Sequence, residues 1–146
     1  MTGARAGTAL AVLLLSSMST VACAQATVQA REPIRPMQFT TVLNQVLQDP
    51  ELKGYTLQTS VAELAPMATD TVDHRHGAEV FGYIIEGSIV TQVNGGAKTT
   101  YAAGQMFYEP RGALHGHFEN PSRDRAARVL IMFLIKEGRP GYTREP

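Results

Sequence analysis

Histidine is the residue type whose placement in this chain points most directly to chemistry. All four histidines fall into two His-x-His pairs, His74 with His76 and His115 with His117. In a strand, residues i and i+2 face the same side roughly 6.5–7 Å apart, so both imidazoles of a pair can reach one ion. A second pair from another strand would complete a site of three or four ligands. The spacing therefore predicts a metal site, whereas a lone histidine on a strand is more often a hydrogen-bonded core residue.

The elements that must position these histidines are short strands. From Tyr55 onward, apolar and polar residues alternate in short segments separated by glycine and proline. This pattern is typical of strands, and Asn94-Gly95-Gly96 predicts a tight hairpin turn. Many short strands at close spacing favour an all-β antiparallel sandwich or barrel. We predict strands over residues 55–61, 80–85, 89–93, 98–101, 106–108, 115–118 and 128–135, the last of them buried on both faces because it is nearly all apolar.

One short helix is predicted ahead of the strands. Phe39, Leu43, Val46 and Leu47 recur at helical spacing, and an Asp-Pro pair ends the pattern, which indicates a helix over about residues 40–48. The preceding residues 25–38 contain prolines and no hydrophobic periodicity. We therefore predict an extended leader there.

Residues 1–24 have the features of a secretory signal peptide. Arg5 gives a positive start, Leu10–Leu15 is an apolar run, and Ala22-Cys23-Ala24 offers the small-x-small pattern of a cleavage site. The run is too short for a membrane span, which needs about 20 apolar residues. We expect an exported protein, periplasmic or secreted, with no transmembrane span in its mature form. The alternative is a lipoprotein anchored at Cys23, because residues 20–23 loosely resemble a lipobox.

Composition indicates a compact globular protein of one domain. The 146 residues are 44% hydrophobic and 18% charged, with 13 basic and 13 acidic side chains and no basic run. Phosphate binding needs a concentrated cationic face, so we expect no nucleic-acid partner. Cys23 is the only cysteine, which excludes an intrachain disulfide and, once the leader is removed, a cysteine nucleophile.

Two motifs, in the order found here, resemble those of the cupin superfamily. The first family motif is His-x-His, three or four residues, Glu, six residues and Gly, and it resembles residues 74–87. The second is Gly, five residues, Pro-x-Gly, two residues, His, three residues and Asn. The chain matches it at Gly104, Pro110, Gly112 and His115, with Asn120 one position late.

The resemblance spans about residues 55–136 and implies the fold. It implies a single cupin β-barrel, jelly-roll-like, which we place at residues 39–140 with the short helix at its N-terminal side. Residues 141–146 are left as a C-terminal tail.

The resemblance also implies that His74, His76 and His115 are metal ligands. Three neutral imidazoles suit one divalent transition metal, Fe, Mn, Zn, Ni or Cu, and leave the charge of the ion available for chemistry.

The acidic ligand of the family has no direct equivalent. Counting back from Gly87, its position is occupied by Val80, and Glu79 lies one residue earlier. Strand alternation turns Glu79 to the opposite face, unless a bulge near Gly77 brings it inward as an additional ligand.

His117 lies outside the family motif. On a regular strand it shares the inward face with His115, where it is an additional ligand or a catalytic general base; the alternative is a histidine at the rim. We expect the pocket to be lined by Val80, Ile84, Tyr83 and Tyr108, and Glu109 is a further candidate for its lining.

Two functions fit these features. The first is a metal-dependent enzyme of dioxygenase, isomerase or decarboxylase type, as the resemblance allows, acting on a partly apolar small molecule. The alternative is a non-catalytic protein that binds a small molecule or a metal, which the missing Glu favours. The resemblance also implies a homodimer, since cupins often pair through edge strands.

Overall fold

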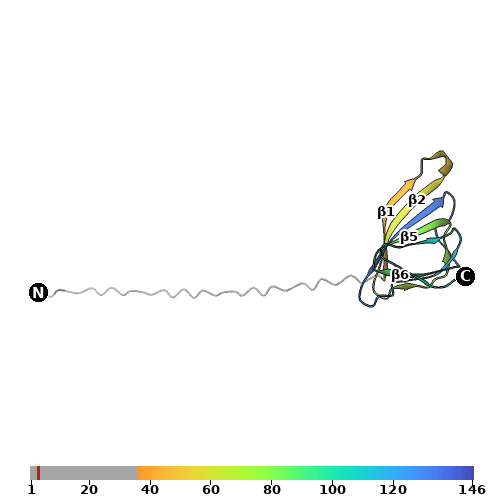
Figure 1. Ribbon diagram of the computed structural model, residues 1–146. Helices are drawn as coiled ribbons and strands as arrows, with labels where there is room; N and C mark the ends of the chain where they lie inside the picture. Colours follow the sequence, from red (N-terminus) through yellow and green to blue (C-terminus); the bar gives the residue numbers. More distant parts are fainter. Residues whose placement is uncertain (1–2, 4–35) are drawn as a thin grey trace. The chain divides into compact units, whose positions relative to one another are not determined.

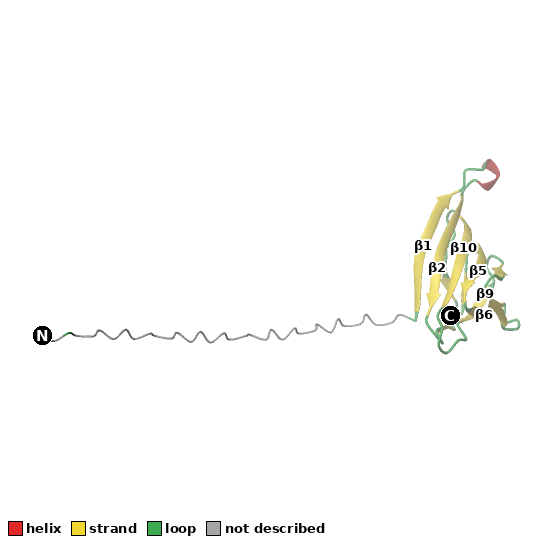
Figure 2. Cartoon of the chain, turned by 60° about the vertical axis from the view of Figure 1, so that its left-hand side comes forward, coloured by secondary structure: helices red, strands yellow, loops and turns green. Residues whose placement is uncertain are grey.

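Two antiparallel sheets make up most of the part of the chain that the structure describes (Figures 1 and 2). The computed structural model describes Gly3 and residues 36–146, so the predicted signal peptide over 1–24 and the leader up to residue 35 lie outside the described residues, Gly3 apart. One sheet has the strand order β1-β2-β10-β5-β8. The other has the order β11-β4-β9-β6-β7, with β3 paired to β9. The all-β prediction is confirmed.

Each strand predicted from residue 55 onward corresponds to a strand of the structure, and three further strands of two residues each were not predicted. Their bounds are β1 (Met37–Val46), β2 (Tyr55–Leu64), β3 (Thr69–Asp70), β4 (His74–Arg75), β5 (Ala78–Glu86), β6 (Ser88–Val93), β7 (Thr99–Ala102), β8 (Met106–Glu109), β9 (Leu114–Glu119), β10 (Ala127–Lys136) and β11 (Thr143–Arg144).

The helix predicted over residues 40–48 is wrong, because this segment belongs to strand β1. β1 pairs antiparallel with β2, and the register shifts between Thr41 and Leu43. A bulge of this kind adds one residue to the strand, so the apolar residues on either side of it no longer recur every second position. Their spacing then imitates a helix. The β-branched and aromatic residues between Phe39 and Val46 suit a strand better than the spacing suggests.

A hairpin joins β1 to β2 and projects beyond the other strands in Figure 1. Its tip carries a single turn of 3-10 helix, η1 (Pro50–Leu52), which Asp49 caps by accepting a hydrogen bond from the backbone of Glu51. Among residues 36–146, no helix has the length and apolar character that a membrane crossing requires.

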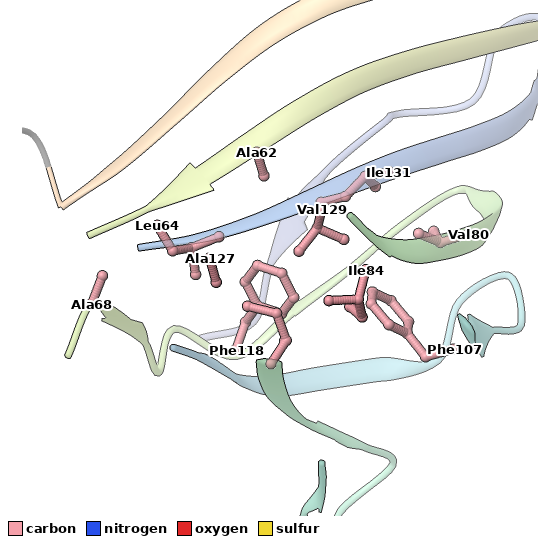
Figure 3. Close-up of a cluster of buried hydrophobic side chains, with 11 residues drawn as sticks. Ala62, Leu64, Ala68, Val80, Ile84, Phe107, Phe118, Ala127, Val129 and Ile131 are labelled. Atoms are coloured by element: carbon pink, nitrogen blue, oxygen red, sulfur yellow. The ribbon is translucent and has the colours of Figure 1, made fainter. Parts of the chain in front are cut away.

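The hydrophobic core lies between the sheets, and β10 contributes three of its residues, Ala127, Val129 and Ile131. This strand sits between β2 and β5, and its residues Val129 and Ile131 point into a cluster that also contains Ile84 of β5 and Phe118 of β9 (Figure 3). The alternate residues of β10 are only partly buried. The prediction that this strand is buried on both faces is therefore wrong for its outer face.

The predicted hairpin turn at Asn94-Gly95-Gly96 is confirmed. Asn94 and Gly95 have φ values of 52° and 65°, the left-handed conformation that a two-residue turn needs at both central positions. The turn returns β6 toward β7, which pairs with it antiparallel.

Candidate metal centre

Three of the four histidines converge inside the space between the sheets. β4 and β9 are paired so that His74 stands opposite His115, and His76 follows directly after β4. The ring centroid of His74 lies 4.8 Å from that of His76 and 4.9 Å from that of His115. One ring nitrogen from each of the three lies within 4.8 Å of the others, so the group can hold a metal ion.

Backbone carbonyls hold the first two rings in one orientation. His74 Nδ1 lies 2.6 Å from the Val72 carbonyl oxygen, and His76 Nδ1 lies 2.9 Å from that of Gly141. A carbonyl only accepts, so both Nδ1 atoms carry the proton and both Nε2 atoms present lone pairs. These two Nε2 atoms are 3.2 Å apart. Two facing lone pairs at this distance repel unless a cation lies between them, which is the arrangement a metal ligand pair requires.

The third ring completes the same pattern. His115 Nε2 lies 3.0 Å from the His117 carbonyl oxygen and 3.1 Å from the Thr91 hydroxyl, so it carries the proton. Its other nitrogen, Nδ1, is buried and has no hydrogen-bond partner among the described residues. A buried polar atom without a partner is costly, and a metal ion would satisfy it. The donor set therefore fits a divalent transition metal.

Burial favours the neutral form of the His76 and His115 rings. Desolvation, with the nearby His74 and His76, lowers the pKa of His115 to about 4. Desolvation also lowers the pKa of His76, although the hydrogen bond to the Gly141 carbonyl opposes the shift. Neutral imidazole is the form that binds a metal, so no proton has to be removed near pH 7.

A carboxyl group that the motifs do not indicate lies beside the histidines. Glu109 of β8 is 2% exposed, and its Oε1 atom lies 3.7 Å from His115 Nε2. Desolvation raises the pKa of Glu109 to about 7. Between about pH 4 and pH 7 both groups are therefore neutral and do not form an ion pair. Strand alternation predicts that the Glu109 side chain points inward, because Glu109 lies two residues after the buried Phe107.

The structure places Glu79 outside this group. Glu79 lies on the outer face of β5, where it accepts hydrogen bonds from the Tyr108 hydroxyl and the Arg111 backbone N–H. Its neighbour Val80 lines the cavity instead. β5 keeps a regular alternation of buried and more exposed residues from Ala78 onward, so no bulge turns Glu79 inward.

His117 also lies outside the group, and the prediction that it shares the inward face with His115 is wrong. Gln92 of β6 pairs with His117 and the next residue, Val93, pairs with His115, so β9 has one residue more than β6 here. This irregularity resets the alternation of β9. Phe118 joins His115 in lining the cavity, and His117 Nε2 lies 2.7 Å from a Glu119 carboxylate oxygen.

A cavity of about 330 Å³ opens onto the three histidines. Val80 lines it, whereas Ile84 belongs to the core cluster, and Tyr83 and Tyr108 are 39% and 52% exposed on the outer face of the sheet. Tyr83 lies three positions after Val80 on β5, and Tyr108 pairs with Phe81, the neighbour of Val80, so alternation turns both rings outward. The walls are mainly aromatic and aliphatic, formed by Met37, Phe39, Val80, Phe107, Phe118, Ile131 and Phe133.

The residues assigned to a C-terminal tail take part in the site. β11 pairs with β4, and Arg75 of β4 forms a 2.7 Å salt bridge to Glu145. This pairing places the Tyr142 ring against His74, stacked with centroids 4.6 Å apart and planes at 25°. The sequence carries no periodic signal for a two-residue strand, so its contribution could not be predicted.

Fold and site together define a class: a double-sheet β-barrel with a candidate three-histidine metal centre in its interior. A comparison with protein families matches residues 60–133 to the family described as Cupin domain. The chain belongs to the cupin family. A search of curated proteins returned no match.

Solved structures share this fold at low sequence identity. A protein from Thermus thermophilus, TT1209, aligns with a TM-score of 0.57 and 23% identity over 73% of this chain and 90% of its own. KdgF from Halomonas sp. aligns with a TM-score of 0.55 and 19% identity over 75% and 86%. The cupin domain of Schizosaccharomyces pombe Cnp3 aligns with a TM-score of 0.56 and 18% identity over 70% of this chain and 66% of that one. These similarities show the fold alone.

Proposed function

We propose that this chain is a metal-dependent cupin that uses one divalent transition metal, held by His74, His76 and His115, to act on a small, partly apolar molecule. The observation that carries the proposal is the donor set. Each ring has one nitrogen turned to an oxygen of the protein, and one nitrogen from each ring lies within 4.8 Å of the other two. A binding protein without catalysis would use the same residues, and assays of turnover separate the two.

The bound metal would supply Lewis-acid or redox chemistry of the dioxygenase, isomerase or decarboxylase type. The protein supplies position and exclusion of water. The Val72 and Gly141 carbonyls hold the His74 and His76 rings, and Tyr142 stacks on His74. The apolar walls of the cavity, Phe107 and Phe118 among them, bind the non-polar part of a ligand and keep water from the reacting atoms.

Bound metal in the tag-free protein, measured by elemental mass spectrometry, tests the centre. We expect about one equivalent of a transition metal, because three converging imidazoles form a mononuclear site. The double variant His74→Ala/His76→Ala should lose it. The matched control is His117→Gln, which changes a buried histidine outside the group and should keep it.

Assays of oxygen uptake with catechols, thiols and diketones then separate an enzyme from a binding protein. Turnover that disappears in His74→Ala/His76→Ala supports the enzyme. Metal and ligand binding without turnover would support the non-catalytic alternative. A protein that is purified without metal and takes up none of Fe, Mn, Zn, Ni or Cu would contradict the proposed function.

We further propose that the protein is exported and dimeric. Export is supported by the signal peptide predicted over residues 1–24, and lipidation at Cys23 is the alternative. Mass spectrometry of the protein recovered after expression of the full sequence tests this proposal. Cleavage after Ala24 would leave a chain that begins at Gln25. The dimer is supported by β1, an edge strand whose residues Gln38–Val46 are all exposed.

A further inference from the structure

Glu109 occupies the place across the sheet from the missing acidic ligand. β5 and β8 pair antiparallel with Val80 directly opposite Glu109. Both side chains are 2% exposed, and both line the cavity. Directly opposed residues have Cβ atoms about 4.5–5.5 Å apart on the same face of a sheet. A carboxylate carried by β8 at this position therefore reaches nearly the same space as one carried by residue 80 on β5.

The Glu109 carboxyl points toward the histidines and has no other partner. Its Oε1 atom lies 3.7 Å from His115 Nε2, and no hydrogen bond among the described residues engages it. Because Nε2 is the protonated nitrogen of His115, this distance places the carboxyl beside the His115 ring and not at the ligand atom itself. Rotation about the side-chain bonds of Glu109 would bring the carboxylate from there to the ion.

The second carboxyl in the cavity is already engaged. Asp70 also lines the cavity, but its Oδ1 atom accepts a 2.9 Å hydrogen bond from the Val72 backbone N–H. This contact holds Asp70 to the loop that carries the Val72 carbonyl, the partner of His74. Of the two carboxyls, Glu109 alone is both buried and unpartnered.

We propose that Glu109 is the fourth protein ligand of the metal centre, a carboxylate moved from β5 to the facing position on β8. A buried charge is stable only when it is paired or bound to a metal, and three neutral imidazoles leave the full charge of a divalent ion to be balanced. The ligand set is then three histidines and one glutamate, drawn from β4 and the residue after it, β9 and β8. This inference rests on the proposed function, because it requires that the three histidines bind a metal.

Cobalt(II) binding to the metal-stripped protein tests the proposal without any assay of activity. The dissociation constant is measured by competition with a chelator, and the visible absorption of the bound cobalt reports its ligand set. We expect Glu109→Gln to bind cobalt at least about tenfold more weakly, the loss that even outer-shell partners cause, with a changed spectrum. The control is Glu79→Gln, a carboxyl on the outer face of β5, which should keep the wild-type spectrum and affinity. Asp70→Asn tests the other carboxyl that lines the cavity.

A variant with the carboxylate moved back gives an independent result. In Val80→Glu/Glu109→Val the pair is exchanged across the same two strands, so the total volume and charge are kept. We expect affinity within about threefold of wild type and a four-ligand spectrum, because opposed positions reach the same space. This variant also decides the question if Glu109→Gln fails to fold, which circular dichroism of the metal-free protein shows.

The outcomes separate the two proposals. Equal affinity and an unchanged spectrum in Glu109→Gln would overturn the role of Glu109 and leave the three-histidine centre standing. The role of Glu109 is equally overturned if Asp70→Asn is the variant that loses affinity, or if the exchanged pair binds no better than Glu109→Gln. Wild-type protein that binds no cobalt would overturn the metal centre itself.

Discussion

At the scale of single residues, His115 and Glu109 make opposite contributions to stability as pH changes. The pKa of His115 is about 4 in the folded chain against an ordinary 6.5, so between these values only the unfolded chain binds the proton and stability falls as the solution is acidified. The pKa of Glu109 is about 7 against 4.5. Here the folded chain keeps a proton that the unfolded chain has lost, and stability falls as pH rises from 4.5 to 7.

Removal of the Glu109 carboxyl should leave the pH dependence of stability that His115 causes without its opposing contribution. The two slopes offset each other between about pH 4.5 and 6.5 in metal-free wild type. Glu109→Gln keeps only the His115 slope, so we expect its free energy of unfolding to fall by up to about 3 kcal/mol between pH 6.5 and pH 4, relative to wild type. Urea unfolding in the presence of a chelator at several pH values measures this. Parallel pH profiles for the two proteins would contradict it.

The residues of the site differ in how far the sequence reveals them. The motif spacing indicates His74, His76 and His115, because it reflects a fixed strand geometry. It fails for His117, whose direction depends on an extra residue in β9 that only the pairing with β6 defines. Glu109 is visible in principle from alternation with Phe107, but its closeness to the histidines follows from the pairing of β5 with β8.

At the scale of elements, alternation of apolar and polar residues predicts the longer strands from residue 55 onward, but it fails where a strand is irregular or very short. The bulge near Thr41 interrupts the alternation in β1, and the two-residue strands β3, β4 and β11 are too short to show any alternation. Of these, β11 matters most for chemistry. It pairs with β4, the Arg75–Glu145 salt bridge lies directly after it, and it follows directly after Gly141 and Tyr142.

Deletion of residues 141–146 should weaken metal binding without unfolding the barrel. The change removes the Gly141 carbonyl that fixes the proton on His76 Nδ1 and the Tyr142 ring that stacks on His74. Loss of such supporting partners costs about 10- to 100-fold in metal affinity. Chelator competition with cobalt(II) measures the loss, and thermal unfolding of the metal-free protein checks the fold. The single variant Tyr142→Ala keeps the carbonyl, so it should lose less; wild-type affinity in the deletion would refute the role of this segment.

At the scale of the whole molecule, the two sheets enclose the core and the cavity but leave apolar surface at the edge of the first sheet. β1 lies at that edge and exposes Phe39 and Val42 by 62% and 59%, together with Leu43 and Val46. Phe39 also lines the cavity. An exposed apolar edge strand of ten residues invites pairing with another chain. A second copy seated on β1 would cover this surface and close the wall of the cavity next to Phe39.

The charged double variant Val42→Lys/Val46→Lys should therefore convert the protein from a dimer into a monomer. Two lysines on each copy place like charges against each other along a shared edge, where water is excluded and repulsion is strong. Light scattering coupled to size exclusion measures the mass of both proteins. The matched control is Met106→Lys on β8, which is 50% exposed at the opposite edge of the same sheet and should remain dimeric.

If Met106→Lys is monomeric and the β1 variant is not, the interface lies on the β8 side, and a monomeric wild type would rule out the dimer altogether. In the expected case the β1 variant should also bind apolar ligands more weakly, because the cavity wall beside Phe39 is then open to water.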